Sequence, residues 1–271
     1  GSCNGKEAFV GMDMISWNKA TEMRKSYFMT DDGAILIAAS NINSKDGEVH
    51  TTIDNRIIKD GKIILNGKEI KEDTVIENPQ NISLNFNENY KGENIGYKVV
   101  YAPQLNLKKE TRTGSWKNIG GTSTEEITKD YFTVYINHGK NPKKSGFAYI
   151  ILPMYTQEEV DSYDVSRFEI VKLDKEAHII KDKKSGVTGI NFWKDSPTKE
   201  LGIKAYSTLS VLLKENEEFL ELWVSDPTQL ANYKSVLEVD GKYEVIESST
   251  ENIQAITSEE KIKIKIDLRN N

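Results

Sequence analysis

Short segments of β-branched and aromatic residues recur along the first part of the chain, and turn signals interrupt them. The segments have the composition of β-strands and lie at residues 34–39, 51–53, 63–65, 82–86 and 97–101. The turn signals pair Asp or Asn with Gly, residues that tolerate the positive φ of a tight hairpin, at Asp32-Gly33, Asp46-Gly47, Asp60-Gly61 and Asn66-Gly67. This pattern predicts an all-β fold of antiparallel sheets.

The strand pattern is interrupted by one segment that has the features of a helix start. An apolar run ends at Pro153, and Thr156 can then cap a short helix, because the acids that follow it suit the positive end of a helix dipole. Strand-like segments restart at Phe168 and continue to the Ile-Lys alternation at 262–266. We predict a large β-sandwich domain at 1–155, a linker at 156–164 and a small β-sandwich domain at 165–271.

The charge balance excludes some classes of partner. The chain carries 36 basic and 42 acidic residues, for a net charge of −6. Nucleic-acid binding relies on clustered Lys and Arg, whereas the basic residues here are interleaved with acids, so no nucleic-acid partner is expected. No stretch approaches the roughly 20 apolar residues that cross a bilayer, and no membrane span is expected.

Cysteine usage limits how the fold can be stabilised. The single cysteine, Cys3, excludes internal disulfides and a cysteine-based zinc cluster. We interpret the Gly-Ser pair before it as the remnant of a removed tag; alternatively, Cys3 is the lipid-modified first residue of a bacterial lipoprotein. No cofactor or metal site is predicted, but a structural calcium ion in a loop stays compatible with the sequence, because its oxygen ligands need no tight spacing.

Histidine is scarce, and motifs of fixed catalytic spacing are absent from the sequence. It contains no phosphate-binding glycine loop, no His-Glu-x-x-His motif, no calcium loop and no nucleophile elbow. Its histidines are His50, on or beside a strand, His138 and His178. His178 lies in a strand-like segment and is predicted to be structural. His138 begins the polar loop 138–146, where functional residues concentrate, although a hydrogen bond that fixes the loop is the commoner role.

Aromatic and basic side chains are the other candidates for a site, since rings stack on sugars and cations pair with carboxylates. Trp116 and Lys117 lie in a polar loop, where Trp116 is either a sugar platform or, more commonly, a plug at the end of a sandwich. Arg56, beside Asn55, either meets an anion or pairs with neighbouring acids. The alternatives given for Trp116 also apply to Trp17 and Trp193.

Several collinear blocks of sequence carry a family resemblance. They are Arg-Lys-Ser-Tyr-Phe-Met-Thr-Asp-Asp at 24–32, Ser-Asn-Ile-Asn-Ser-Lys-Asp-Gly at 40–47, Thr-Thr-Ile-Asp-Asn-Arg at 51–56, and shorter blocks at 94–97, 114–119 and 136–142. Together they resemble polysaccharide lyase family 8, which includes hyaluronate, chondroitin AC and xanthan lyases, with Tyr27 where the family has Trp and Asp54 where it has Glu. The resemblance covers roughly residues 6–153; the remainder resembles the family's small terminal β domain in length and pattern.

The resemblance implies a modular parent protein. A helical toroid would precede a large antiparallel β-sandwich of the galactose-mutarotase-like supersandwich type, and a smaller carboxyl-terminal β-sandwich would follow. This chain would start after the opening strands of the large sandwich, which would then be truncated. A bacterial protein, either secreted or attached to the cell surface, is expected.

The resemblance also implies the chemistry. Family members cleave an acidic polysaccharide by β-elimination at a uronic acid, with an Asn that holds the carboxylate and a Tyr/His pair, aided by Arg, that moves protons. Neutralising the carboxylate acidifies the C5 proton before a base removes it. These groups belong to the helical toroid, which nothing in this sequence matches. No catalytic residue is therefore assigned, and the chain alone is expected to be inactive.

The leading hypothesis is that the chain is the β portion of a lyase for hyaluronan- or chondroitin-like polysaccharide. It would support the helical catalytic domain and line the substrate cleft. The candidate substrate-binding residues are Asn55, Arg56, Trp116, Lys117 and His138. A stand-alone carbohydrate-binding or adhesion module on a lyase-derived scaffold is the alternative, and a purely structural β protein is a third hypothesis.

Overall fold

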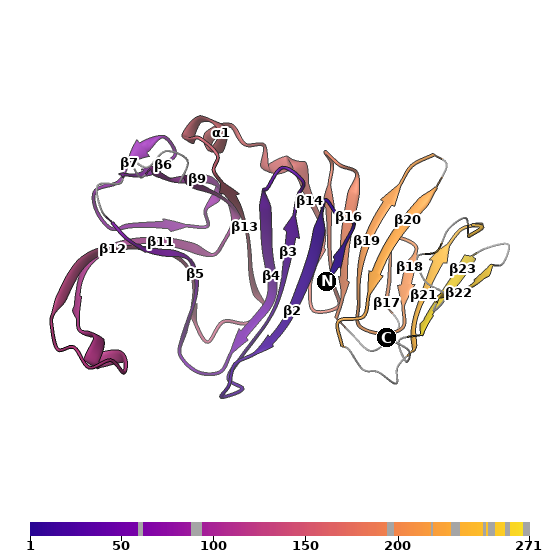
Figure 1. The fold of residues 1–271 in the computed structure, drawn as a ribbon, viewed down its shortest axis with the longest axis horizontal. Helices are drawn as coiled ribbons and strands as arrows, with labels where there is room; N and C mark the ends of the chain where they lie inside the picture. Colours follow the sequence, from indigo (N-terminus) through magenta and orange to yellow (C-terminus); the bar gives the residue numbers. More distant parts are fainter. Residues whose placement is uncertain are drawn as a thin grey trace. The chain divides into compact units, whose positions relative to one another are not determined.

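The structure is a computed structural model that describes residues 1–58, 62–87, 94–193, 198–217, 219–228, 234–245, 248, 253–257 and 261–267. The chain divides into two compact units (Figure 1). Unit 1 comprises Gly1–Asp13, Arg24–Asp31 and Ser166–Asn271, and unit 2 comprises Met14–Met23 and Asp32–Val165. Both units are built from antiparallel strands, which confirms the predicted all-β fold.

One sheet of unit 2 has the strand order β4-β13-β10-β9-β6-β7. Its strands are β4 (Ile35–Ser44), β13 (Ser145–Pro153), β10 (Ile95–Tyr101), β9 (Gln80–Asn87), β6 (Lys62–Leu65) and β7 (Lys68–Glu69). Successive side chains of a strand point to opposite faces, so Leu84 and Phe86 of β9 share a face with Val99 of β10, and all of them are buried.

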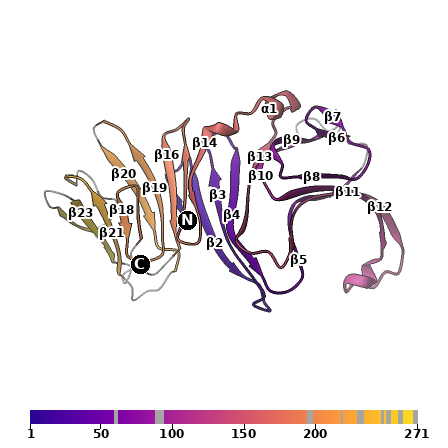
Figure 2. The same cartoon turned by 180° about the vertical axis from the view of Figure 1, so that it is seen from behind.

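The second sheet of unit 2 has the order β5-β12-β11-β8, and Figure 2 shows β8 beside β11. Its strands are β5 (Glu48–Ile57), β12 (Ile127–Lys140), β11 (Gln104–Gly114) and β8 (Thr74–Glu77). Phe132, Val134 and Ile136 of β12 are fully buried. The ring of Phe132 meets that of Phe86 with centroids 5.2 Å apart, so the two sheets enclose a common core and form the predicted large sandwich.

The Asp-Gly and Asn-Gly turns adopt the expected backbone where the structure describes them. Gly33, Gly47 and Gly67 have φ angles of +85°, +77° and +75°, a region that residues with a Cβ rarely adopt. β6 and β7 pair around Asn66-Gly67 as a hairpin. The remaining predicted turn, Asp60-Gly61, lies outside the described residues.

Helix α1 (Gln157–Ser162) forms in the segment predicted as a helical linker. Thr156 caps it as expected: the Thr156 hydroxyl accepts from the Glu159 backbone N–H, and the Glu159 carboxylate accepts from the Thr156 N–H at 2.7 Å. Val160 is fully buried and packs on Gly96 of β10, where no side chain would fit. The helix therefore packs on a sheet of unit 2. The domain boundaries near 155 and 165 stay a prediction.

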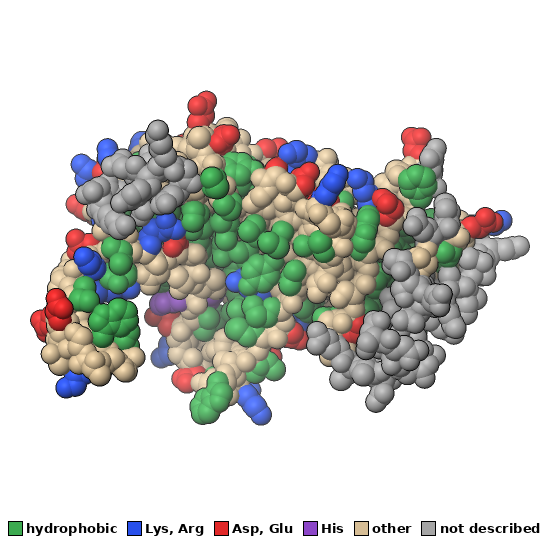
Figure 3. Space-filling model, in the orientation of Figure 1, with side chains coloured by type: hydrophobic (Ala, Val, Ile, Leu, Met, Phe, Trp, Pro, Cys, Tyr) green, Lys and Arg blue, Asp and Glu red, His purple; other side chains and the backbone are tan. Residues whose placement is uncertain are grey.

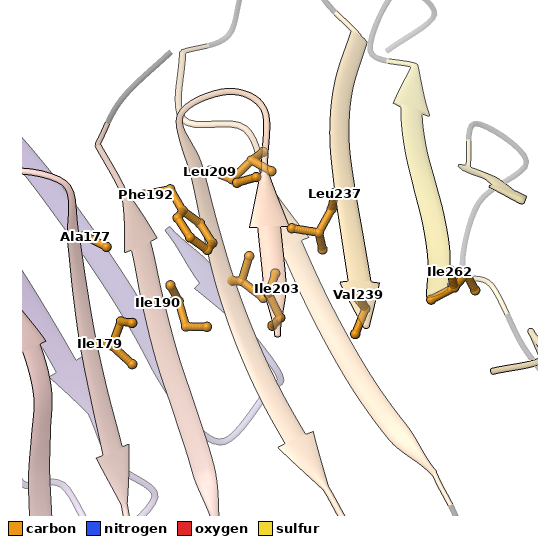
Figure 4. Close-up of a cluster of buried hydrophobic side chains, with 11 residues drawn as sticks. Ala177, Ile179, Ile190, Phe192, Ile203, Leu209, Leu237, Val239 and Ile262 are labelled. Carbon is orange, nitrogen blue, oxygen red and sulfur yellow. The ribbon is translucent and has the colours of Figure 1, made fainter. Parts of the chain in front are cut away.

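Unit 1 contains a sheet of order β14-β15-β16-β19-β20 and a sheet of order β17-β18-β21-β23-β22. The 3₁₀ turn η2 (Val165–Arg167) precedes β14. The strands are β14 (Phe168–Leu173), β15 (Ala177–Asp182), β16 (Val187–Phe192), β17 (Thr198–Glu200), β18 (Ile203–Ala205), β19 (Leu209–Glu215), β20 (Leu220–Ser225), β21 (Lys234–Asp240), β22 (Ile253–Thr257) and β23 (Lys261–Asp267). Apolar side chains of both sheets, including Ile190, Phe192 and Leu237, form one buried cluster (Figure 4). This is the predicted small sandwich.

The amino-terminal strands contribute to unit 1 as well. They are β1 (Ser2–Cys3) and the parts of β2 (Ala8–Ile15) and β3 (Thr21–Met29) that fall within this unit. Phe9 and Phe28 meet edge to face with centroids 5.5 Å apart, and Phe28 lies 6.0 Å from Phe168. The first strands of the chain and its carboxyl-terminal part therefore share one core.

A buried polar cluster fixes β3 against β15 and β16 within unit 1. The Ser26 hydroxyl lies 2.8 Å from His178 Nδ1 and accepts from Asn191 Nδ2 at 2.9 Å. The ring of Trp193 packs on that of His178 with centroids 5.0 Å apart. Burial lowers the pKa of His178 to about 3, so the ring is neutral at pH 7. Both His178 and Trp193 thus have the structural role that the sequence favours.

Replacing His178 with Ala should lower the free energy of unfolding by about 2 kcal/mol or more, because the Ser26 hydroxyl loses a buried partner and a cavity opens. Urea denaturation followed by tryptophan fluorescence measures this loss. The control is His50→Ala at an exposed site, which should change the value by less than about 0.5 kcal/mol. An equally small loss in both variants would contradict the structural role of the cluster.

Candidate functional site

The outer face of the sheet β5-β12-β11 gathers aromatic and charged side chains. The alternation that buries Phe132 and Val134 of β12 sends Tyr131, Thr133 and Tyr135 to the opposite side. Residues opposite them in the antiparallel register share that side. We define the outer face as His50, Asn55, Lys108, Glu110, Arg112, Tyr131, Thr133 and Tyr135.

Arg112 is the best-fixed cation of the outer face. Its Cζ lies 4.5 Å from the centroid of the Tyr131 ring, a cation–π contact. The guanidinium also donates to Glu110, to Asn55 Oδ1 at 3.3 Å and to Thr133 Oγ1 at 3.1 Å. Its side chain is still 39% exposed. A planar cation is thus held in one orientation with part of its surface open to solvent.

Glu110 lies between two cations on this face. Its carboxylate is 2.8 Å from Lys108 Nζ and is hydrogen-bonded to Arg112. The hydrogen bond from Lys108, and to a lesser extent the one from Arg112, holds the pKa of Glu110 below its usual value. The same bond to Glu110 raises the pKa of Lys108. All of these groups are therefore charged at neutral pH, which leaves a net charge of about +1 on this cluster.

Rings line the other end of the outer face. The imidazole of His50 stacks on Tyr135 with centroids 4.5 Å apart and planes inclined by 37°. His50 Nε2 lies 3.7 Å from Glu48 Oε2, and the other oxygen of that carboxylate, Oε1, accepts from Asn137 Nδ2 at 3.1 Å. Flat rings flanked by amides and charges can bind a pyranose by stacking and hydrogen bonding.

The outer face borders an open hollow of unit 2. Beyond its contact with β5, the β11–β12 hairpin continues as an arm, defined here as residues 111–130, which ends in the 3₁₀ turn η1 (Trp116–Ile119). Figure 1 shows the arm curving away from the sandwich opposite the lower end of β5. In the space-filling view the space between them stays open, with histidine at its edge (Figure 3). A polymer could therefore reach this face from solvent.

Asn55 and Arg56 are adjacent in sequence but lie on opposite faces. Asn55 is exposed on the outer face, where it accepts from Arg112. Arg56 points into the sandwich: its Cζ lies 4.6 Å from the Phe86 ring, and its guanidinium forms an ion pair with Asp54. Asp54 also accepts from the Tyr97 hydroxyl at 2.7 Å. Burial, and to a lesser extent the negative charge of Asp54, raises the pKa of Tyr97. Arg56 thus pairs with a neighbouring acid, the second of its two interpretations.

His138 is buried on β12 rather than exposed at the start of a loop. Its Nε2 lies 2.9 Å from the Thr51 hydroxyl and its Nδ1 2.9 Å from the Ser145 hydroxyl. Burial, and to a lesser extent the charge of His50, lowers its pKa to about 4. The geometry matches the alternative of a hydrogen bond that fixes the local structure, since the ring connects β5, β12 and β13.

Trp116 and Lys117 lie at the tip of the arm, where both are exposed. In the strand register, Arg56 lies opposite Phe132 of β12. Phe132 is five residues along β12 from Ile127, where the strand leaves the tip, so Arg56 lies about 17 Å along the strand from the base of the tip. His138 lies six residues from Phe132 in the other direction. Measured along β12, the five candidates therefore lie at three separate levels: Trp116 and Lys117 at the tip, Asn55 and Arg56 near Phe132, and His138 beyond it. Their roles in substrate contact stay a prediction.

Sequence reasoning did not identify most of the outer face. Lys108, Glu110 and Arg112 alternate along β11, as Tyr131, Thr133 and Tyr135 do along β12. Polar side chains at every second position of two neighbouring strands would have indicated an exposed polar sheet face. Trp17, by contrast, is 99% exposed, which does not fit a plug at the end of a sandwich.

Other kinds of site find little support among the described residues. Within that part of the chain, no group of three His, Cys, Asp or Glu side chains is placed to hold a metal ion, and none of the described helices has the length and apolarity needed to cross a bilayer. A shallow depression on α1 is lined by Gln157, Glu158, Asp161 and Ser162 and contains none of the candidate residues.

Comparison with protein families identifies both sandwiches. Residues 1–164 match the super-sandwich domain of polysaccharide lyase family 8, and residues 169–232 match the C-terminal beta-sandwich domain of the same family. The chain belongs to polysaccharide lyase family 8. This confirms the resemblance that the sequence blocks indicated and the predicted fold class of a supersandwich followed by a smaller β-sandwich.

Relatives within polysaccharide lyase family 8 are lyases named for different polysaccharides. A xanthan lyase of Bacillus sp. (strain GL1) is 31% identical over 250 residues, which are 87% of this chain and 26% of that protein. The hyaluronate lyase HylB of Enterococcus faecalis (strain ATCC 700802 / V583) is 26% identical over 238 residues, 86% of this chain and 23% of that protein. The chain thus spans about a quarter of the length of these relatives.

Solved structures agree with the family assignment. The structure of Paenibacillus xanthan lyase superposes with a TM-score of 0.87 at 27% identity and covers 99% of this chain and 27% of that one. The chondroitin AC lyase of Streptomyces coelicolor A3 superposes with a TM-score of 0.76 at 21% identity, covering 98% of this chain and 33% of that one. At that identity the likeness concerns the fold alone.

The two buried histidines should titrate far below the usual range. In an NMR pH titration of the imidazole resonances, His138 should have its midpoint near pH 4, and the His138→Gln variant should lack that resonance. Because the folded state resists protonation and the unfolded state takes up the proton near pH 6.5, this residue's contribution to stability is lost as the pH falls from about 6.5 towards 4. A midpoint of His138 near 6.5 would contradict its buried, hydroxyl-bonded environment.

Proposed function

We propose that this chain is the β portion of a lyase that acts on an acidic polysaccharide, and that its outer face contacts the polymer. The observation that carries this proposal is the Arg112 guanidinium, fixed on the Tyr131 ring and beside Asn55 on an open sheet face. A fixed, partly exposed cation beside a ring and an amide suits a uronic acid, because it offers a partner for the carboxylate and a surface for the pyranose.

Family membership supports the same class of substrate. Relatives are named for xanthan, hyaluronate and chondroitin, polymers that carry carboxylates. An arginine that neutralises a sugar carboxylate also lowers the barrier to removing the neighbouring C5 proton, which is the first requirement of β-elimination at a uronic acid. In this proposal the outer face holds and orients the polymer, and groups on a helical catalytic domain of the parent protein carry out the proton transfers.

A secreted or cell-surface bacterial location belongs to the same proposal. The polymers after which the relatives are named are too large to enter a bacterial cell intact, so a lyase for them would work outside it. The chain would line one wall of the cleft and support the catalytic domain beside it.

A stand-alone carbohydrate-binding module is the second candidate function. It is favoured by one observation: the contacts that fix Arg112, which come from Glu110, Asn55, Thr133 and Tyr131, all lie within this chain. A face preorganised in this way would bind sugar without a catalytic domain. The two functions differ in whether binding is accompanied by cleavage when the rest of the parent protein is present.

Arg112→Met should weaken binding of acidic polymers. Isothermal titration with hyaluronan, chondroitin sulphate and xanthan should show an affinity at least about fivefold lower, since about 1 kcal/mol of charge-assisted hydrogen bonding is lost. The wild-type affinity should also fall with added salt, and neutral dextran should bind poorly to either protein.

Lys143→Met is the matched control for that experiment, because it removes one positive charge from an exposed loop residue outside the outer face. It should bind within about twofold of the wild type, a difference of roughly 0.4 kcal/mol. Equal weakening by both substitutions would show that net charge, and not the outer face, drives binding, and would overturn the proposal.

The isolated chain should not cleave these polymers. Incubation with each acidic polysaccharide, followed by ultraviolet absorbance of the unsaturated product, should give no signal above a heat-denatured control. The reason is that the groups proposed to move protons lie on another domain. Sustained product formation by the purified chain would show that the catalytic groups lie within these residues.

A further inference from the structure

The hairpin that joins β2 to β3 presents a tryptophan to solvent. Trp17 lies in the hairpin tip, residues 16–20, and is 99% exposed, so nearly the whole surface of its indole ring is open. This exposure rules out a plug at the end of a sandwich and leaves the other role that the sequence allows, a platform for a sugar. The hairpin tip belongs to unit 2, which also carries the outer face.

Hydrogen bonds within the hairpin tip hold it in one shape. The Ser16 backbone N–H donates to the Thr21 carbonyl at 2.8 Å, and the Lys19 N–H donates to the Ser16 carbonyl at 2.8 Å. Asn18 Oδ1 accepts from the Ser16 hydroxyl at 2.7 Å and from the Ala20 N–H at 3.1 Å. A loop that is already fixed loses little further freedom when a ligand binds. The hairpin tip is therefore preorganised to present its ring.

The hairpin tip is also fastened to the turn that joins β4 to β5, residues 45–47. The Lys45 backbone N–H donates to the Ala20 carbonyl at 2.9 Å, and the hydroxyls of Thr21 and Ser44 lie 2.9 Å apart. Figure 1 shows the two connections side by side at the lower end of unit 2. These bonds place Lys45 beside the segment that carries Trp17.

Cations accompany the ring. Lys19 in the hairpin tip and Lys45 in the neighbouring turn are both exposed. Asp46 is the acidic residue of these two segments, 16–20 and 45–47, whose formal net charge is +1. A lysine can pair with a carboxylate while the indole stacks on a pyranose. We define the hairpin site as Trp17, Lys19 and Lys45.

The surroundings of Trp17 favour a sugar over a protein partner. Its neighbours in the hairpin tip are polar, since Ser16 precedes it and Asn18 and Lys19 follow. Ile15, at the end of β2, is 63% exposed and is the apolar residue next to this group. The centre of a protein interface is mostly apolar and poor in lysine, whereas a ring bordered by an amide and cations suits an acidic sugar.

The hairpin site lies beyond one end of the outer face. β5 begins at Glu48, directly after the turn that contains Lys45, and His50 of the outer face follows two residues later. Asn55, at the Arg112 end of the outer face, is seven residues from Glu48, which is roughly 20 Å along an extended strand. A short oligosaccharide held at Arg112 would therefore not extend to the hairpin site, whereas a long polymer would.

We propose that the hairpin site is a second contact for acidic polysaccharide, separate from the outer face, in which Trp17 stacks on a sugar ring and Lys19 and Lys45 pair with carboxylates. This inference rests on the proposed function, which supplies the ligand. A polymer already held at the outer face presents its next segment to Trp17 at a high effective concentration. The hairpin site therefore strengthens the binding of long chains and leaves that of short ones unchanged.

The test compares long-chain hyaluronan with a hyaluronan tetrasaccharide by isothermal titration. Trp17→Ala should lower the affinity for the long chain at least about fivefold, because the second contact is lost. The same variant should bind the tetrasaccharide within about twofold of the wild type. Trp17→Tyr keeps a flat ring and should retain most of the affinity for the long chain. Phe219→Ala, at an exposed aromatic residue of unit 1, is the matched control and should bind both ligands like the wild type.

The outcomes separate this inference from the proposed function. Arg112→Met should weaken the binding of both ligands, whereas Trp17→Ala should affect the long chain alone and keep the wild-type unfolding midpoint. Unchanged affinity of Trp17→Ala for long-chain hyaluronan overturns the hairpin site. An equal loss for the tetrasaccharide also overturns it, because Trp17 would then belong to the same contact as Arg112. Binding of the wild-type chain to phosphatidylglycerol vesicles that Trp17→Ala abolishes overturns it in favour of a membrane contact. If Arg112→Met changes neither affinity while the loss in Trp17→Ala persists, the proposed role of the outer face fails and the hairpin site stands.

Discussion

The antiparallel register of β12 with its neighbours β5 and β11 determines where every candidate group of unit 2 points. Because side chains alternate along a strand, Phe132, Val134 and Ile136 fill the core while Tyr131, Thr133 and Tyr135 face solvent. A shift of one residue would exchange the two sets, which would bury the hydroxyl groups of Tyr131, Thr133 and Tyr135 and expose the apolar side chains. The apolar contact between the rings of Phe132 and Phe86 favours the observed register. The outer face and the arm both follow from that pairing.

The same register separates residues that look equivalent in the sequence. Asn55 and Arg56 are neighbours, yet one joins the outer face and the other pairs with Asp54 in the interior. His138 shares the inner side with Phe132 and is satisfied by two hydroxyls. The guanidinium of Arg112, on β11, reaches Asn55 of β5 across the intervening strand β12, and its side chain is 39% exposed to an anionic ligand. A binding surface on a sheet is assembled across strands, so adjacency along the chain is a poor guide to it.

The sequence predicted the fold class, the Asp-Gly turns and the cap of α1, because these depend on local residue types such as Gly33 and Thr156. The family was recognisable from blocks whose order is preserved along the chain. The outer face was not predicted, since Arg112 and Tyr131 meet only through the pairing of β11 with β12. The contribution of Phe9 and Phe28 to a core that also contains Phe168 was likewise hidden, because it joins residues far apart in sequence and depends on tertiary packing.

The central claim is that the outer face of β5, β12 and β11 binds acidic polysaccharide. Backbone amide NMR shifts of the chain, recorded with and without a hyaluronan oligosaccharide, test it most directly. The account predicts shifts centred on Asn55, Arg112, Tyr131 and Thr133, and little change in the strands of unit 1 other than at exposed loops. Shifts confined to unit 1, or none at saturating oligosaccharide, would contradict it.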